Sequence, residues 1–182
     1  MIKNDLSVRE MGLADIDAVT HYWLSAEPAF LMGMGVDLKK MPAREQWVEL
    51  LSEQVNAPIE KKQSYYIIWQ ADGRSIGHCN TRPILYGEEA FMHLHLWDLT
   101  VRKKGLGTEL VRMTLPYFFK NLRLKKLYCE PYAENPAPNS TLRRLGFDLV
   151  REYTTIPGFL NFEQPVKRWE LSYESFINNP TT

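Results

Sequence analysis

The chain has 182 residues, the length of one domain, and its 45% hydrophobic and 24% charged residues are typical of a folded chain rather than a disordered one. Its 22 basic and 22 acidic side chains give a formal net charge of zero. This balance removes the main electrostatic reason for binding nucleic acid or an anionic membrane. The chain contains neither a signal-peptide pattern nor a run of about 20 apolar residues. We therefore expect a cytoplasmic protein with one domain over residues 1–182.

Two cysteines, Cys79 and Cys129, are too few for a disulfide framework. Neither belongs to a CxxC or Cys/His pattern, so we expect no metal site.

Hydrophobic spacing predicts a mixed α/β fold. Asp72-Gly73 lies between two β-rich runs and predicts a hairpin, because glycine accepts the positive φ that a tight turn requires. Pro116 lies inside an amphipathic helix and should kink that helix or end it early. In chain order, the expected elements are a strand at 6–10, helices at 15–23 and 42–55, strands at 65–70, 75–81 and 91–99, a helix at 107–120, a strand at 127–130, a helix at 135–146, and strands at 147–155 and 166–173.

The junction at residues 99–108, LTVRKKGLGT, is the most informative part of the sequence. It connects a predicted strand to a predicted helix, where glycines let the backbone turn and the first N–H groups of the helix are free to bind a ligand. Three consecutive cations, at 102–104, add to the positive helix end, and this combination favours a phosphate or pyrophosphate. The spacing excludes a P-loop, and Leu110 stands where a dinucleotide-binding GxGxxG motif needs its third glycine. A tight loop with solvated lysines is the alternative interpretation.

Residues 102–107, RKKGLG, match the pattern R/Q-x-x-G-x-G/A, and about thirty residues later NPAPN at 135–139 leads into LRRLGF at 142–147. Together these motifs resemble the GNAT superfamily of N-acetyltransferases, particularly the branch that contains the ribosomal-protein alanine acetyltransferases. The resemblance implies a mixed, mostly antiparallel central sheet of about six or seven strands flanked by about four helices. It also implies acetyl-CoA as the acetyl donor, with coenzyme A as a product.

Carried over to this chain, the resemblance assigns the coenzyme-binding residues. The end of the central strand, at Leu99 and Val101, would pair with the pantetheine amides, and Asn139 would face the pantetheine arm. Asn135 is better explained as a helix N-cap. The N–H groups that would surround the pyrophosphate belong to Arg102, Lys103, Lys104, Gly105, Leu106, Gly107 and Thr108.

The acceptor in this superfamily is a primary amine, which must lose a proton before it attacks the thioester. Strand alternation places His93 and His95 on one face, and a histidine suits this proton transfer at neutral pH. We expect His95 to be the general base, with His93, Asp98 and Glu130 as alternatives. Both histidines could instead be hydrogen-bonded core residues.

The sequence departs from the family pattern at two positions. Many members carry a Tyr five residues before the Phe of Leu-Gly-Phe, where it protonates the leaving thiolate, and this chain has Leu142 there. Pro138 replaces the Ser that is common in the ribosomal-protein branch. We therefore expect Tyr132 to act as the acid, or Ser140 in its place.

The acceptor site is expected between the aromatic loop at 156–165, where Glu163 could attract a cationic amine, and the methionine-containing region at 28–42. The predicted function is acetyl transfer to a small-molecule or peptidyl amine. A protein that binds an acyl-CoA or a partner without turnover is the alternative, and a longer acyl-CoA could replace acetyl-CoA as donor. A homodimer is compatible with the sequence.

Overall fold

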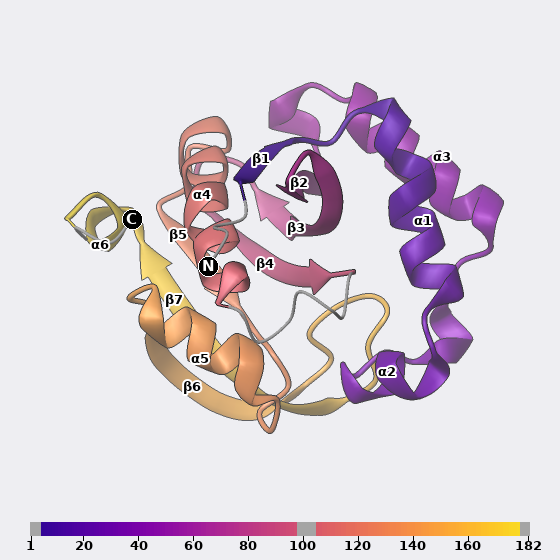
Figure 1. Cartoon of the computed structure of the whole chain (residues 1–182). Coiled ribbons are helices and arrows are strands. Elements are labelled where there is room, and N and C mark those ends of the chain that lie inside the picture. The colour runs from indigo at the N-terminus through magenta and orange to yellow at the C-terminus, as the bar shows by residue number, and fades with distance from the viewer. Residues whose placement is uncertain (1–4, 98–104, 179–182) are drawn as a thin grey trace.

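The computed structural model describes residues 5–97 and 105–178. A seven-stranded sheet in the order β1-β2-β3-β4-β5-β7-β6 runs through the molecule (Figure 1). All neighbouring strands are antiparallel except β4 and β5, which are parallel. The strands are β1 (Leu6–Glu10), β2 (Tyr65–Ala71), β3 (Arg74–Leu85), β4 (Glu89–Leu96), β5 (Lys126–Cys129), β6 (Asp148–Thr155) and β7 (Gln164–Ser172). The α-helices are α1 (Ile16–Ser25), α2 (Pro28–Gly33), α3 (Arg44–Asn56), α4 (Leu106–Asn121), α5 (Pro136–Arg144) and α6 (Tyr173–Asn178).

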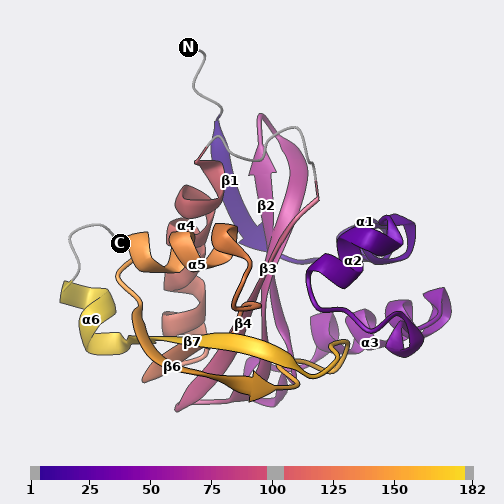
Figure 2. The same cartoon turned by 90° about the horizontal axis from the view of Figure 1, so that it is seen from below.

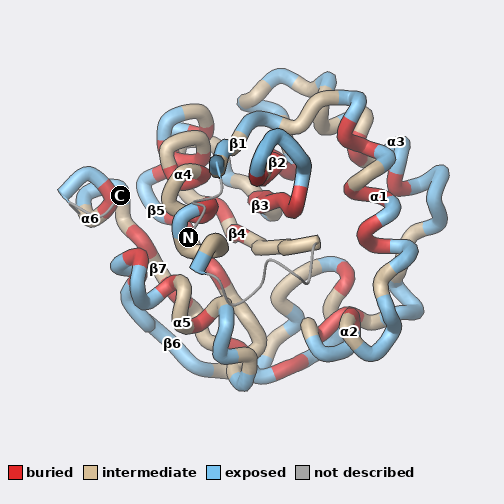
Figure 3. The backbone as a smooth tube through the Cα atoms, viewed as in Figure 1, coloured by how far each residue is buried: buried red, intermediate tan, exposed pale blue. Residues whose placement is uncertain are grey.

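The sheet separates two hydrophobic cores, and β2 contributes to both. Its side chains alternate, so that Tyr65, Ile67 and Trp69 pack in the core beneath α4 and α5, whereas Tyr66 and Ile68 pack in the core beneath α1 and α3. Figure 3 shows the buried residues along these facing surfaces. A strand that is buried on both faces reads as a continuous apolar run, which explains the sequence YYIIW.

The predicted fold class is confirmed: the structure is a mixed α/β fold with a mostly antiparallel sheet. The described residues form six α-helices rather than about four. The two extra helices, α2 and α6, are only six residues long, too short to give a clear periodic pattern. No helix within the described ranges is long and apolar enough to cross a membrane.

Of the two effects expected of Pro116, the early end of the helix was wrong, because α4 continues five residues further, to Asn121. The kink stays a prediction. A proline removes one backbone hydrogen bond from a helix. Here the residues on both sides of it, Leu115, Phe118 and Phe119, are buried against the sheet. The free energy gained by burying these side chains exceeds the free-energy cost of the lost hydrogen bond.

The sheet opens where β4 and β5 diverge, and this opening positions the candidate site. The two strands pair from Glu89 and Lys126 as far as Met92 and Cys129, where β5 ends. β4 continues to Leu96 along β3 alone, while the chain after β5 stays beside β7. Figure 2 shows β6 and β7 running across the direction of β1–β4. Among the described residues, the edge of β4 at 93–95 that faces away from β3 therefore has no strand partner.

Candidate active site

The start of α4 has the properties of an anion-binding helix end. Gly105 occupies the N-cap position with φ of 76°, which is left-handed and accessible to glycine without strain. It has no side chain to cap the helix, so the first N–H groups of α4 lack a side-chain acceptor. A Cβ placed on Gly105 or Gly107 would have no described neighbour within 4 Å, so the space beside both residues is open.

Part of the predicted coenzyme-binding segment lies outside the described residues, namely Leu99, Val101, Arg102, Lys103 and Lys104. The predicted alternative base Asp98 also lies there. The remaining members of the segment, Gly105, Leu106, Gly107 and Thr108, form the N-cap and first turn of α4.

Asn139 is buried in α5, and its side chain makes bonds within the protein. Its Oδ1 accepts a hydrogen bond from Trp169 Nε1 at 2.8 Å. Its Nδ2 donates to the carbonyls of Tyr132 and Asn135, at 3.1 and 2.7 Å. Asn139 thus ties α5 to β7 and to the turn after β5, and its predicted contact with pantetheine stays a prediction. Asn135 is the N-cap of α5, as expected, because its side chain accepts from the N–H of Ala137.

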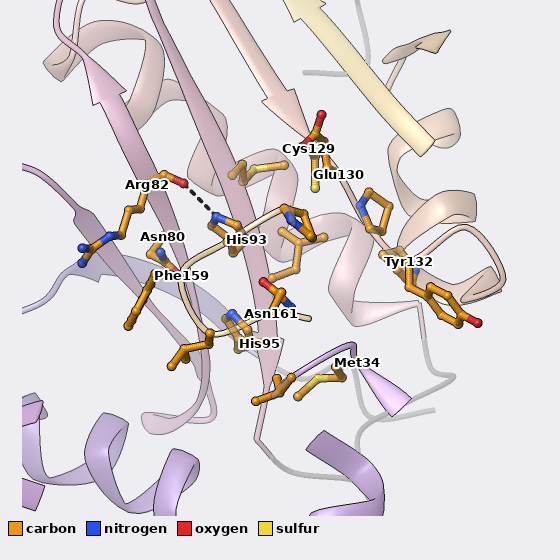
Figure 4. Close-up of a pocket in the computed structure, with 18 of the residues that line it drawn as sticks. Met34, Asn80, Arg82, His93, His95, Cys129, Glu130, Tyr132, Phe159 and Asn161 are labelled. Carbon is orange, nitrogen blue, oxygen red and sulfur yellow. Dashed lines mark hydrogen bonds between the residues drawn. The ribbon is translucent and has the colours of Figure 1, made fainter. Parts of the chain in front are cut away.

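A cavity of about 310 Å³ lies at the opening of the sheet (Figure 4). Its walls come from both diverging strands, from β3, from α1 and α3, and from the loop between β6 and β7. The described residues that line it are Trp23, Met34, Val36, Trp47, Tyr66, Asn80, Arg82, Pro83, Met92, His93, Leu94, His95, Cys129, Glu130, Pro131, Tyr132, Asn135, Pro138, Pro157, Gly158, Phe159, Leu160, Asn161 and Gln164.

The β6–β7 loop is joined to the turn after α2, so the two segments expected around the acceptor form one continuous wall. Asp37 N–H donates to the Leu160 carbonyl at 2.7 Å, and the Asn161 side chain donates to the Gly35 carbonyl at 2.9 Å. Gly35 has φ of 82°, and a Cβ there would lie 1.9 Å from the Gln164 side chain. Only glycine fits this close approach. Glu163 is exposed and is not among the described lining residues, so it does not supply a charge to the cavity.

His95 belongs to a cluster of packed rings. Its ring stacks on His78 with centroids 4.6 Å apart, and it meets the edge of Trp23 at 4.7 Å. Its Nδ1 lies 3.4 Å from the Tyr22 hydroxyl. Burial, together with His78 and His93, holds the pKa of His95 well below its ordinary value. His95 is therefore neutral at pH 7 and has a lone pair that can accept a proton.

His78 lies behind His95, and its burial lowers its pKa to about 3. Trp97 Nε1 donates to His78 Nδ1 at 2.8 Å. In the neutral ring the proton must therefore reside on Nε2, which is buried without a hydrogen-bond partner in the described part of the chain.

His93 lies two residues before His95, on the same face of β4. Its Nε2 is 2.9 Å from the Arg82 carbonyl, which can only accept, so Nε2 carries the proton (Figure 4). Burial is the largest cause of the lowered pKa of His93. This hydrogen bond fixes the ring, which supports a positioning role better than a role as the base.

Glu130, the other alternative base, is already paired. Its side chain is 5% exposed, forms an ion pair with Arg168 and accepts a hydrogen bond from Tyr153. Arg168 also donates to the Tyr153 hydroxyl at 2.6 Å. Glu130 is therefore engaged by two donors within the protein, which supports a structural role for it.

Tyr132 lines the cavity, but its hydroxyl donates to Glu134 at 3.3 Å, and in Figure 4 its ring extends away from His93 and His95. The charge of Glu134 is the largest cause of the raised pKa of Tyr132, so the phenol keeps its proton at neutral pH. Leu142, which stands where the family acid is usual, is completely buried in the core. Pro138, at the other variant position, lines the cavity.

Sequence reasoning missed much of the aromatic and polar wall, including Trp23, Trp47, Tyr66, Asn80 and Arg82. Their helical or strand periodicity indicates core positions, and nothing in the sequence distinguishes a core aromatic residue from one that borders a cavity. One local signal was available: the proline after Arg82 interrupts a strand pattern. It coincides with a shift in the register of β3 and β4 between Thr81 and Ile84.

The sequence profile of the acetyltransferase (GNAT) domain matches residues 5–148, most of the chain. The chain belongs to the GNAT acetyltransferase family. It is thus an acyltransferase by family, as the motifs at 102–107 and 135–147 predicted. It matches none of the curated proteins.

Solved GNAT structures share the fold along nearly the whole chain. A spermidine N-acetyltransferase from Vibrio cholerae, in complex with CoA and spermine, has a TM-score of 0.76 at 19% identity and covers 95% of this chain and 98% of its own. The ribosomal L7/L12 α-N-protein acetyltransferase RimL, in complex with CoA, has a TM-score of 0.76 at 12% identity, with 96% and 98% covered. The aminoglycoside acetyltransferase AAC(6')-Ib, in complex with coenzyme A, has a TM-score of 0.73 at 16% identity, with 96% and 99% covered. Because the three sequence identities are low, these comparisons establish only that the chain shares the GNAT fold.

Proposed function

We propose that this acyltransferase transfers the acetyl group of acetyl-CoA to a primary amine. Three features of the described residues carry the proposal: a helix start without a side-chain cap at Gly105, an edge of β4 without a strand partner at 93–95, and a cavity where β4 and β5 diverge. The first feature suits a pyrophosphate, the second suits the amides of an extended chain, and the third suits an acceptor.

The donor would lie along the opening of the sheet. The N–H groups of the first turn of α4 would bind the pyrophosphate, helped by the helix dipole and by the cations at 102–104. The edge of β4 at 93–95, which has no strand partner among the described residues, would pair with the pantetheine arm, as an added strand would. No described residue would contact a Cβ on Gly105 or Gly107, which supports a phosphate group beside this helix start. The solved relatives that contain CoA support coenzyme binding by this fold.

The reaction joins the amine nitrogen to the acetyl carbon, breaks the bond from that carbon to sulfur and releases the thiol of CoA. His95 is the proposed base, because its neutral ring lines the cavity and can take the proton that the amine loses. The cavity is largely apolar, and burial lowers the pKa of an amine that enters it. A weakly basic acceptor such as His95 then suffices.

Protonation of the leaving thiolate is assigned to Tyr132, whose phenol remains protonated at neutral pH. Its hydroxyl bonds to Glu134 in this structure, so a rotation of the side chain would have to bring it to the sulfur. A free thiol has a pKa of about 8.5, so departure without an acid is tolerable.

The fold leaves the acceptor open, because the solved relatives are named for polyamine, aminoglycoside and ribosomal-protein amines. The motif resemblance to the ribosomal-protein branch supports a peptidyl amine, and the enclosed cavity supports a small molecule. A second candidate function is acyl-CoA binding without turnover. The buried Leu142, in place of the usual acid, favours it.

The test is acetyl-CoA binding by calorimetry, followed by thiol release with a panel of primary amines. Saturable binding with amine-dependent thiol release is the expected result. Binding without release from any amine would favour the second candidate. No binding would overturn the proposal.

A further inference from the structure

Few charged side chains border the cavity. Among the described lining residues, only Arg82 and Glu130 carry a full charge at neutral pH. The Glu130 carboxylate is neutralised by Arg168. Arg82 forms no ion pair with any described residue. The described lining of the cavity therefore offers one cation without an ion-pair partner among those residues and no unpaired carboxylate.

Arg82 is held at one side of the cavity by its backbone and by its side chain. The register of β3 and β4 shifts beside it, and its carbonyl accepts from the fixed His93 ring at 2.9 Å. Its guanidinium lies 4.4 Å from the centroid of the Phe159 ring, on the same side of the cavity as Asn80 (Figure 4). Stacking on a ring uses the face of the guanidinium and leaves its in-plane N–H donors available. Those donors match the two oxygens of a carboxylate.

The rest of the wall is aromatic. Trp23 and Trp47 stack with centroids 5.7 Å apart, and Trp47 meets the edge of Phe159 at 6.1 Å. Burial raises the pKa of Tyr66 to about 12, so its phenol adds no charge. Asn80 is nearly buried, and its side chain has no hydrogen-bond partner among the described residues, so it can bind a polar group of a ligand.

The cavity volume of about 310 Å³ is at the small end of the range for ligand pockets, roughly 300–1,000 Å³. It has space for a ring and a short chain. A polycation would enter an apolar space without a counter-charge, and its desolvation would cost several kcal/mol for each ammonium group.

We propose that the acceptor is a small primary amine with an aromatic body and one carboxylate, the chemical class of the aromatic amino acids, and that Arg82 binds its carboxylate. This inference rests on the proposed acetyl transfer. The ring lies against Trp47 and Phe159, and the amine is directed towards His95.

The experiment compares three probes with the full chain: L-phenylalanine, phenethylamine, which lacks the carboxylate, and spermidine, which is a polycation. The wild-type kcat/KM for L-phenylalanine is expected to exceed the values for both other amines. Arg82→Leu should raise the KM for L-phenylalanine about 10- to 100-fold more than the KM for phenethylamine, because it removes a charged hydrogen bond. Arg151→Leu is the matched control, since Arg151 also lies 4.4 Å from an aromatic ring, that of Tyr153, but outside the cavity lining.

The outcomes separate this inference from the proposed function. Preference for spermidine, or equal use of phenylalanine and phenethylamine, would overturn the acceptor class while the acetyl transfer stood. Failure of acetyl-CoA to bind would overturn the acetyl transfer itself. If Arg82→Leu does not fold, the comparison of the three amines with the wild-type enzyme still decides whether the acceptor belongs to the proposed class.

Discussion

The start of α4 and the aromatic cavity are built differently, and no α4 residue is among the described residues that line the cavity. The helix start is continuous in sequence, and its proposed binding groups are backbone N–H groups that a glycine leaves uncapped. The cavity gathers side chains from α1, α3, β3, β4 and the β6–β7 loop, and its polar rings are buried and neutral. One local segment can therefore form a backbone site for an anion. A cavity lined by side chains, in contrast, requires segments that are far apart in the chain to pack together.

The largest expected effect is on the helix start. Gly105→Glu puts a side chain and a negative charge beside the proposed pyrophosphate site, and acetyl-CoA binding should fall below detection by calorimetry. Gly87→Glu is the matched control. Gly87 has φ of 80°, close to the 76° of Gly105, and its N–H bonds to Leu122 beyond the other end of α4. Both variants carry the same backbone strain. Equal coenzyme affinity in the two variants would refute the assignment of the helix start.

The next effect tests the cavity side. His95→Ala should lower kcat about 100-fold, because a positioned general base contributes at least that much, and should leave the affinity for acetyl-CoA nearly unchanged. The control is His21→Ala, since His21 is exposed on α1 and outside the cavity lining. Turnover at the wild-type rate would remove His95 from the mechanism.

The smallest effect is on stability and concerns the buried histidines behind the cavity. Burial lowers the pKa of His78, His93 and His95 in the folded chain, whereas the unfolded chain binds protons near pH 6.5. Below that pH the unfolded state therefore holds more protons, and the free energy of unfolding falls by about 1.4 kcal/mol per pH unit for each such histidine. Urea unfolding between about pH 7.5 and pH 5.5 measures this slope.

His78→Gln should make that slope shallower by removing one of the three groups. An unchanged slope would show that His78 does not titrate differently in the folded and unfolded states. Coenzyme binding at the start of α4, which uses backbone groups, should change little over the same range of pH.

The sequence by itself indicated the strands and the two motifs, because strand alternation, a glycine at a helix start and an Asn-Pro cap are local properties that follow from backbone sterics and hydrogen bonding. The family followed from the resemblance of those motifs to a known pattern. His95 was also named from the sequence, because alternation fixes its face. Only the tertiary structure decided what that face contacts. It stacked His95 on His78, paired Glu130 with Arg168 and placed Arg82 beside Phe159, with no ion-pair partner in the described part of the chain. Those contacts join residues far apart in the chain, so their burial and charge balance exist only once the segments are packed together.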